Sequence, residues 1–249
     1  MIKNTVTCLS IIVFLLMFSS SSVYAGFELD AETGAVFTGY NDVRIPGDLG
    51  TKISLSDDLD GDPVWHYRAR LGYTFNETHY VGLLAASLSI TYGGRLDKNI
   101  IFQEKAFTSG TDVDATFMFN SYRFTYRYLR IHTDTLTVGV GLTAKVRHAS
   151  IKVESDTQSA EKKDLGFVPL LSFLVHWKFA QPVGFLVDGD ALASKQGRAE
   201  DVLFALTWDI TRNIQARGGY RILEGGADND EVYTFSMFHY AVAGVTFTF

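Results

Sequence analysis

Cysteine is almost absent from this chain of 249 residues, and its one cysteine, Cys8, lies near the start. The region 26–249 therefore holds no thiol, which excludes a disulfide framework and a thiolate zinc site. The six histidines show no spacing typical of a metal site, so we expect neither a metal nor a cofactor. Basic residues are also in deficit, with 22 Lys and Arg against 28 Asp and Glu and a net charge of −6. This balance argues against nucleic acid as a partner.

Long apolar runs are confined to the N-terminus. One lysine is followed by an apolar run from Leu9 to Phe18, a serine tract and the small-residue site Val23-Tyr24-Ala25. This order is typical of a secretory signal peptide. We predict a signal peptide over residues 1–25, export through the Sec pathway and a single domain over 26–249. Since no second long apolar segment follows, a helical membrane span is excluded.

The rest of the chain alternates between apolar and polar side chains. The closing stretch "YAVAGVTFTF" shows the pattern, with Phe249, Phe247 and Val245 separated by threonines. A period of two is typical of a β-strand with two chemically different faces. We expect ten such strands, at residues 27–39, 64–75, 80–92, 120–128, 136–148, 170–179, 183–191, 201–210, 214–222 and 240–249. Two further segments, 51–55 and 99–107, either pair outside the main sheet or raise the count to twelve.

The connections between these segments separate two kinds of all-β fold. Alternation alone fits a soluble sandwich, whose apolar faces form the core. A closed barrel can instead turn its apolar face to lipid, since all its backbone hydrogen bonds are satisfied. Short turns are expected at 76–79, 132–134, 181–182 and 211–213, and long polar connections at 41–62, 93–111, 154–164, 194–200 and 225–231. This regular sequence of long and short connections predicts a closed antiparallel transmembrane β-barrel.

The final residue carries a resemblance. An alternating last strand that ends in phenylalanine, here Phe249, resembles the closing strand of small outer-membrane β-barrels of Gram-negative bacteria. The resemblance covers the signal peptide, the alternation and the last strand. It implies an outer-membrane location, contact with outer-membrane lipid and lipopolysaccharide, and recognition of Phe249 by the barrel-assembly machinery as an assembly signal. It implies no particular activity.

The polar face of the strands predicts the contents of the lumen. The charged residues expected to point inward are Glu28, Asp30, Glu32, Arg68, Arg70, Arg123, Arg127, Lys145, Arg147, Lys178, Asp188, Asp190, Asp201, Asp209, Arg217 and Arg221. Acidic strands alternate with basic ones, and buried charges are tolerated when they are paired. We therefore predict Arg–carboxylate bridges and a largely plugged lumen. On the strand at 80–92 we expect Leu84, Leu88 and Ile90 to face outward.

Three functions remain open on these residues. The first is a non-enzymatic membrane protein with a structural or surface-interaction role. The second is a narrow, porin-like channel that prefers anions, because inward bases slightly outnumber inward acids. The third resembles outer-membrane hydrolases of the omptin or lipid A-modifying type, with a rim site near His148, which neighbours Ser150. His148 is only a weak candidate, because no nucleophile motif surrounds it. The acids expected at its level are Asp201, Glu224, Asp228, Asp230 and Glu231. Two other histidines, His66 and His176, are expected to make hydrogen bonds in the lumen.

Overall fold

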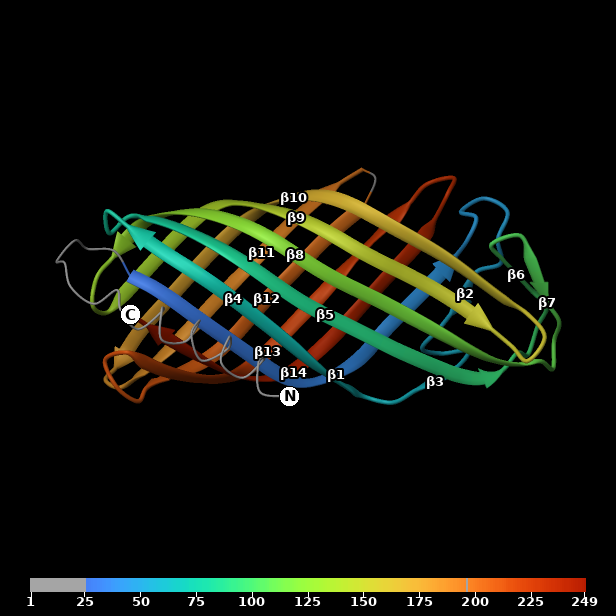
Figure 1. Ribbon diagram of the computed structural model, residues 1–249, viewed down its shortest axis with the longest axis horizontal. Coiled ribbons are helices and arrows are strands. Elements are labelled where there is room, and N and C mark those ends of the chain that lie inside the picture. Colours follow the sequence, from blue (N-terminus) through green and yellow to red (C-terminus); the bar gives the residue numbers. More distant parts are fainter. Residues whose placement is uncertain (1–25, 196) are drawn as a thin grey trace, which may run out of the picture.

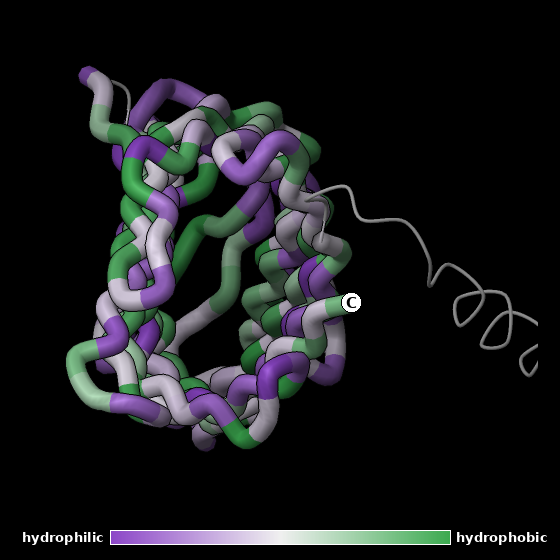
Figure 2. Tube along the Cα trace, turned by 90° about the vertical axis from the view of Figure 1, so that its left-hand side faces the viewer, coloured by the Kyte–Doolittle hydropathy of each residue, from purple (hydrophilic) through white to green (hydrophobic). Residues whose placement is uncertain are grey.

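The computed structural model describes residues 26–195 and 197–249 as one closed antiparallel β-barrel (Figure 1). Its ten main strands are β1 (Gly26–Arg44), β4 (Val64–Phe75), β5 (His79–Arg95), β8 (Asp112–His132), β9 (Leu136–Glu154), β10 (Ser159–Ala180), β11 (Val183–Ser194), β12 (Gly197–Asp209), β13 (Ile214–Asp228) and β14 (Tyr233–Thr248). Each strand pairs with the next, and β14 pairs with β1 along nearly its whole length. Seen from one end, the strands form a closed ring that is longer in one direction (Figure 2). The predicted fold class is confirmed, while the predicted signal peptide lies outside the described residues.

Four short strands lie at one end of the barrel, which we call the outer end. β2 (Ile53–Ser54) pairs with β1, and β3 (Asp60–Gly61) pairs with β5. β6 (Ile100–Phe102) and β7 (Lys105–Phe107) form a separate hairpin at the far right of Figure 1. The segments 51–55 and 99–107 therefore pair beyond the main ring and do not raise its strand count to twelve. Within the described ranges, no helix is long and apolar enough to cross a membrane.

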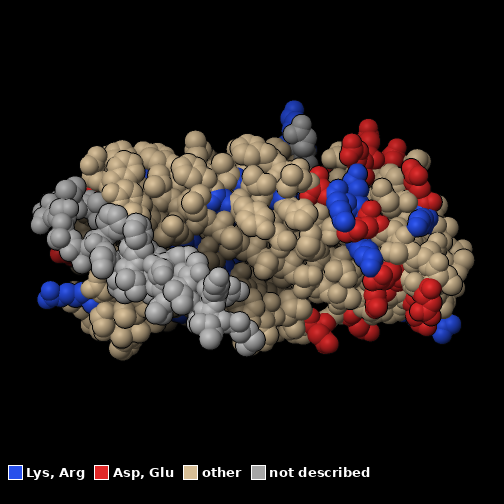
Figure 3. All heavy atoms as spheres, viewed as in Figure 1, with Lys and Arg blue, Asp and Glu red and all other residues tan. Residues whose placement is uncertain are grey.

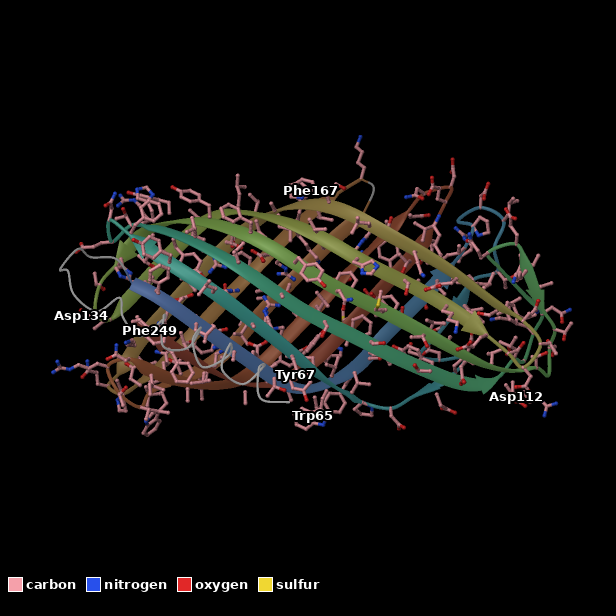
Figure 4. All side chains as sticks on the ribbon, in the orientation of Figure 1. Trp65, Tyr67, Asp112, Asp134, Phe167 and Phe249 are labelled. Atoms are coloured by element: carbon pink, nitrogen blue, oxygen red, sulfur yellow. The ribbon has the colours of Figure 1, made fainter. Side chains whose placement is uncertain are left out.

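The opposite end, which we call the turn end, holds the short connections and the last residue. Figure 4 shows Phe249 and Asp134 at this end and Asp112 at the outer end. The Phe249 N–H donates to the Phe27 carbonyl oxygen at 2.8 Å, and the Asn213 side chain donates to the Thr248 carbonyl oxygen at 2.7 Å. The final strand is thus held by β1 and by the turn between β12 and β13, so its last residue does not fray.

An apolar belt surrounds the barrel from the turn end to about the middle of its length. Figure 3 shows this part of the visible face with few charges, whereas acidic and basic side chains gather toward the outer end. In Figure 4, Trp65, Tyr67 and Phe167 project away from the wall. The belt includes Phe27, Leu29, Trp65, Tyr67, Leu71, Leu83, Tyr122, Phe124, Val140, Leu142, Phe167, Leu171, Trp177, Phe204, Leu206 and Trp208, all of which are exposed.

The chemistry of the two faces reverses along single strands. On the belt part of β8, Tyr122 and Phe124 face outward while Arg123 is buried inside. Nearer the outer end the same strand buries Val113 and Phe117 and exposes acidic and polar neighbours. Beyond the belt the surroundings are therefore polar, and the apolar face turns to the interior, as in a soluble barrel.

This reversal corrects the prediction for β5. Leu84, Leu88 and Ile90 were expected to face outward, but they are buried inside the barrel, with at most 6% of their surface exposed. Leu83 instead faces outward in the belt and is 57% exposed. For Leu88 and Ile90 the prediction was wrong because they lie beyond the belt, where the apolar face turns inward. Leu84 lies within the belt, level with Arg123, and there two consecutive leucines left the phase of the alternation undetermined.

The reversed segments enclose an apolar outer core. It packs across the bore at the outer end and is capped by Leu55 and Leu59 of the loop after β1 and by Phe107 of β7. Tyr92 and Phe238 are among its largest fully buried side chains. The sequence predicted a charged lumen throughout, whereas the structure divides the interior into a charged part and an apolar part.

Three of the predicted long connections are in fact extended hairpins. The segments 154–164, 194–200 and 225–231 consist mostly of paired strand residues with short turns at their tips. Only the connections after β1 and β5 are long, and these carry the four short strands. The hairpin segments looked like loops because their outward residues are polar, yet backbone pairing does not require an apolar exterior.

The turn between β4 and β5 allows a test of local backbone strain. Asn76 and Glu77 both have positive φ, at 50° and 57°, which is the geometry of a type I′ turn. Because glycine adopts this region freely, we expect Glu77→Gly to raise the free energy of unfolding by about 1 kcal/mol. Urea titration in detergent micelles measures the effect. The control Glu161→Gly, in strand β10, should lower stability, and a loss of stability with Glu77→Gly would contradict the prediction.

Candidate functional site

A charged layer crosses the bore between the outer core and the turn end. We define it by Asp30, Glu32, Arg68, Arg70, Arg123, Arg127, Asp188, Asp190, Asp201, Arg217 and Arg221. These side chains stand at inward positions of six strands, β1, β4, β8, β11, β12 and β13, where the period of two sends every second side chain inward.

Asp201 on β12 is the main acceptor of this layer. Its carboxylate accepts from Arg68 of β4 at 2.8 Å, from Arg221 of β13 at 2.6 Å and, in a short contact, from Arg123 of β8. All four side chains are at least nine-tenths buried. One carboxylate therefore ties together strands from three parts of the wall.

Glu32 on β1 forms a second acceptor group. It accepts from Arg221 at 2.8 and 2.9 Å and from Arg217 at 2.9 Å, and Arg217 also donates to Asp30 at 2.9 Å. Gly244 of β14 leaves the room for this guanidinium, since a Cβ there would lie 2.6 Å from Arg217 Cζ. The glycine between the charged strands is thus part of the packing of the layer.

A third group lies around β11. Asp188 accepts from Arg70 at 2.7 Å and also pairs with Arg127. Asp190 accepts from Arg123 at 2.7 Å and from the Thr143 hydroxyl at 2.7 Å. Arg123 donates to both Asp190 and Asp201, and Arg221 donates to both Asp201 and Glu32, so the three groups form one network.

Most of these bridges cross the bore instead of joining neighbouring strands. The sequence suggested that adjacent acidic and basic strands would pair, but Arg68 and Arg70 of β4 donate to acids on β12 and β11. Glu28, one of the acids for which an arginine bridge was predicted, accepts instead from the Tyr80 hydroxyl at 2.8 Å. The inward arginines are long enough to reach the far wall, so spatial distance across the bore decides the partner.

The remaining predicted lumen residues lie outside the layer. Lys178 donates to Asp209 at 2.8 Å toward the turn end, and Arg147 pairs with Asp164 toward the outer end. Lys145 is buried and makes no hydrogen bond or ion pair with any described residue; its ammonium lies 4.7 Å from the Phe119 ring centroid.

Two histidines were expected to make lumen hydrogen bonds. His176 does so, with Nε2 3.0 Å from the Thr207 hydroxyl. His66 does not: neither ring nitrogen has a hydrogen-bond partner among the described residues, and Nε2 lies 3.8 Å from Glu32. The His66 ring packs on Tyr240 at 4.8 Å and lines a cavity of about 30 Å³, roughly the volume of one water molecule.

His148 lies within paired strand at the outer edge of the belt. It pairs in register with Asn120 and Leu165 at the outer edge of the belt. No hydrogen bond or ion pair joins it to a carboxylate anywhere in residues 26–195 or 197–249. Of the acids considered as partners, Asp201 belongs to the charged layer and Glu224 is held by Arg198.

A separate polar cluster joins β1, β12 and β13 beyond the belt. Arg198 Nε donates to Glu224 at 2.7 Å, and the Tyr40 hydroxyl donates to the same carboxylate. Burial raises the pKa of Glu224, but the hydrogen bonds from Arg198 and Tyr40 outweigh it, and the pKa is lowered overall. The hydrogen bonds to Glu224 and Tyr40 raise the pKa of Arg198. This cluster keeps its charges at neutral pH and fastens the hairpins beyond the belt.

The neutral partners of the charged layer were missed from the sequence. Thr143, Ser121 and Ser172 accept or donate hydrogen bonds to its charged groups, as does Tyr80 at Glu28. Their inward positions in the alternating pattern were the available signal. A hydroxyl at such a position indicates a polar neighbour, but it does not reveal which one.

We compared the chain and its fold with known proteins. No protein-family model matches the chain, and no curated protein matches it either. Among solved structures, the outer membrane protease OmpT of Escherichia coli is similar with a TM-score of 0.57 and 8% identity, over 93% of this chain and 99% of that one. The transport unit of the autotransporter AIDA-I of Escherichia coli gives a TM-score of 0.45 and 8% identity, over 94% and 92% of the two chains.

These findings define the class of protein. The chain has the fold of Gram-negative outer-membrane β-barrels, a closed antiparallel barrel of ten strands with short strands added at one end. The resemblance seen in the final strand is confirmed at the level of fold. At 8% identity the likeness to OmpT extends to the fold alone.

Proposed function

We propose that this chain is a non-enzymatic integral protein of a Gram-negative outer membrane, with a sealed bore and a structural or surface-interaction role. The observation that carries the proposal is the closure of the bore by two layers in series. The charged layer spans the belt part, where Asp201 binds arginines from three strands. Beyond it, the outer core narrows the bore with packed apolar side chains such as Tyr92, Phe117 and Phe238.

The exterior of the barrel supports the proposed location. The belt exposes large apolar and aromatic side chains around the wall, which suits lipid and not water. Lipid and lipopolysaccharide are accordingly the proposed surroundings of the belt. The proposed role of Phe249 in recognition by the assembly machinery is supported by its place at the end of a fully paired closing strand.

The channel alternative has less support. Apart from Lys145, the deeply buried cations of the bore are engaged by carboxylates or hydroxyls, so they do not offer a free row of anion sites. An anion that crossed the bore would also have to pass the packed apolar side chains of the outer core. We therefore expect the barrel to resist ion flow.

Planar-bilayer recording tests the proposal. We expect the purified barrel to show no unitary conductance, and Arg123→Ala to remain silent because the outer core still closes the bore. A large porin in the same bilayer serves as a positive control. A change in migration between unheated and heated samples in SDS gels verifies that each protein is folded. Chloride-selective steps in the unaltered barrel that disappear in Arg123→Ala would overturn the sealed bore in favour of a channel.

A further inference from the structure

The barrel wall has an opening beside the outer part of β10. β10 pairs with β9 from Ser159 to Trp177, but its ladder with β11 begins only at Leu171. In the described ranges, residues 159–170 therefore have a strand neighbour on one side alone. Figure 1 shows why: the hairpin of β11 and β12 ends far short of the end of β10. We call this interruption the side opening.

The exposed edge at the side opening carries features that oppose pairing with another chain. Glu161 and Lys163 place charges on the outer surface of the edge, and Pro169 lacks the N–H that a further strand would need. The opening is therefore protected against strand addition.

A pocket of about 200 Å³ lies behind the side opening. Its walls come from β8, β9 and β10 on one side and from β12, β13 and β14 on the other. The apolar part of its lining is formed by Ile45, Phe117, Phe119, Ile151, Val168, Leu223, Val232 and Phe238. The pocket is smaller than the roughly 300–1,000 Å³ of sites for drug-sized ligands, so it suits a narrow group.

One cation in this pocket has no ion-pair partner. Lys145 lines the pocket and is 97% buried, yet no described carboxylate lies within 4 Å of its ammonium. The other three cations of the lining are paired, Arg147 with Asp164, Lys162 with Glu231 and Arg198 with Glu224. A buried ammonium is costly without a partner, so an acidic group at this position would be stabilised.

The pocket also lies level with the edge of the belt. Leu165 and Phe167 stand on the outer surface of the same β10 segment and are 73% and 66% exposed. Figure 4 shows Phe167 projecting from the wall. A molecule whose apolar chain lies along the belt can therefore place its head group in the pocket through the side opening.

We propose that this pocket binds a single-chain amphiphile with one acidic head group, such as a long-chain carboxylate. The acidic group lies against Lys145, and the first part of the chain lies against Phe119 and Phe238 and leaves through the side opening. The inference goes beyond the proposed sealed bore and is independent of it, since the pocket lies on the outer side of the charged layer.

A photo-crosslinking experiment with the full barrel tests this site. The barrel is placed in nanodiscs of zwitterionic lipid and titrated with a palmitic acid analogue that carries a diazirine near its carboxylate. Mass spectrometry then locates the labelled peptides. We expect saturable labelling of segments that line the pocket. Lys145→Met should lower the affinity for the probe about tenfold or more, because a hydrogen-bonded charge pair is lost.

Matched variants separate the site from general lipid contact. Lys163→Met removes a cation from the outer face of β10 and should bind like the unaltered barrel, while Lys145→Arg should keep most of the affinity. Ala199→Phe fills the pocket without changing its charges and should also weaken binding. Heat-modifiable gel mobility verifies folding of each variant.

Competition identifies the chemistry that is recognised. Unlabelled palmitate should displace the probe, whereas hexadecanol and inorganic phosphate should not. Displacement by hexadecanol as effective as by palmitate would remove the need for an acidic head, and displacement by phosphate alone would remove the need for a chain. Either result, or equal labelling of Lys145→Met and the unaltered barrel, would overturn the proposal. The bilayer recordings that test the sealed bore do not depend on this outcome.

Discussion

Asp201→Asn is expected to lower the free energy of unfolding of the barrel by about 3–5 kcal/mol, the cost of breaking a buried ion pair on one side. The variant keeps the size of the side chain and removes its charge. Arg68, Arg123 and Arg221 would then lose the carboxylate that they share, and all three are more than nine-tenths buried. Urea unfolding in detergent micelles, followed by tryptophan fluorescence, measures the change.

Asp209→Asn is the matched control for this prediction. Asp209 also pairs with a base, Lys178, but both side chains are about a quarter exposed near the turn end. Solvent screens such a pair, so we expect a loss of about 1 kcal/mol or less. Equal losses for the two variants would mean that the charged layer does not hold the wall together, and the role given to Asp201 would be wrong.

Phe117→Ala is expected to cost about 3–5 kcal/mol, as for large aromatic side chains in soluble protein cores. Phe117 is 5% exposed and lies 5.3 Å from the ring of Phe238 in the outer core. Its removal would leave a cavity whose rigid strand walls cannot collapse. The same urea titration measures the loss.

Phe124→Ala, on the same strand, provides the comparison. Phe124 faces outward in the belt and is 51% exposed, so detergent or lipid replaces much of what its ring contacts. We expect a clearly smaller loss than for Phe117→Ala. A larger effect at Phe124 than at Phe117 would contradict the reversal of the two faces along β8.

The strands within the belt were largely predictable from the sequence. There the exterior is apolar, so every second residue is apolar, and the pattern "YRFTYRY" on β8 assigns Tyr122 and Phe124 to the outside and Arg123 to the inside. The same alternation identified the inward charges, since a charge that alternates with aromatic residues has only the interior to face. Closure by the last strand was likewise visible in the pattern that ends at Phe249.

Beyond the belt the alternation persisted, but its meaning changed. Leu88 and Ile90 alternate with serine and threonine as lipid-facing residues would. The local sequence does not indicate whether their apolar face points outward to lipid or inward to the barrel interior. That depends on the height of the segment relative to the belt, which only the register of all ten strands defines. The extended hairpins were mistaken for loops for the same reason.

By itself the sequence determined the fold class, the approximate strand positions and the polarity of each face within the belt, because these follow from local alternation. The tertiary structure alone decided that Asp201 serves three arginines, that Lys145 is left without a carboxylate, and that β10 has an open edge beside a pocket. Each of these depends on distances between residues far apart in the chain. Alternation specifies the direction of a side chain, whereas its partner is set by the curvature of the closed wall and the unequal lengths of its hairpins.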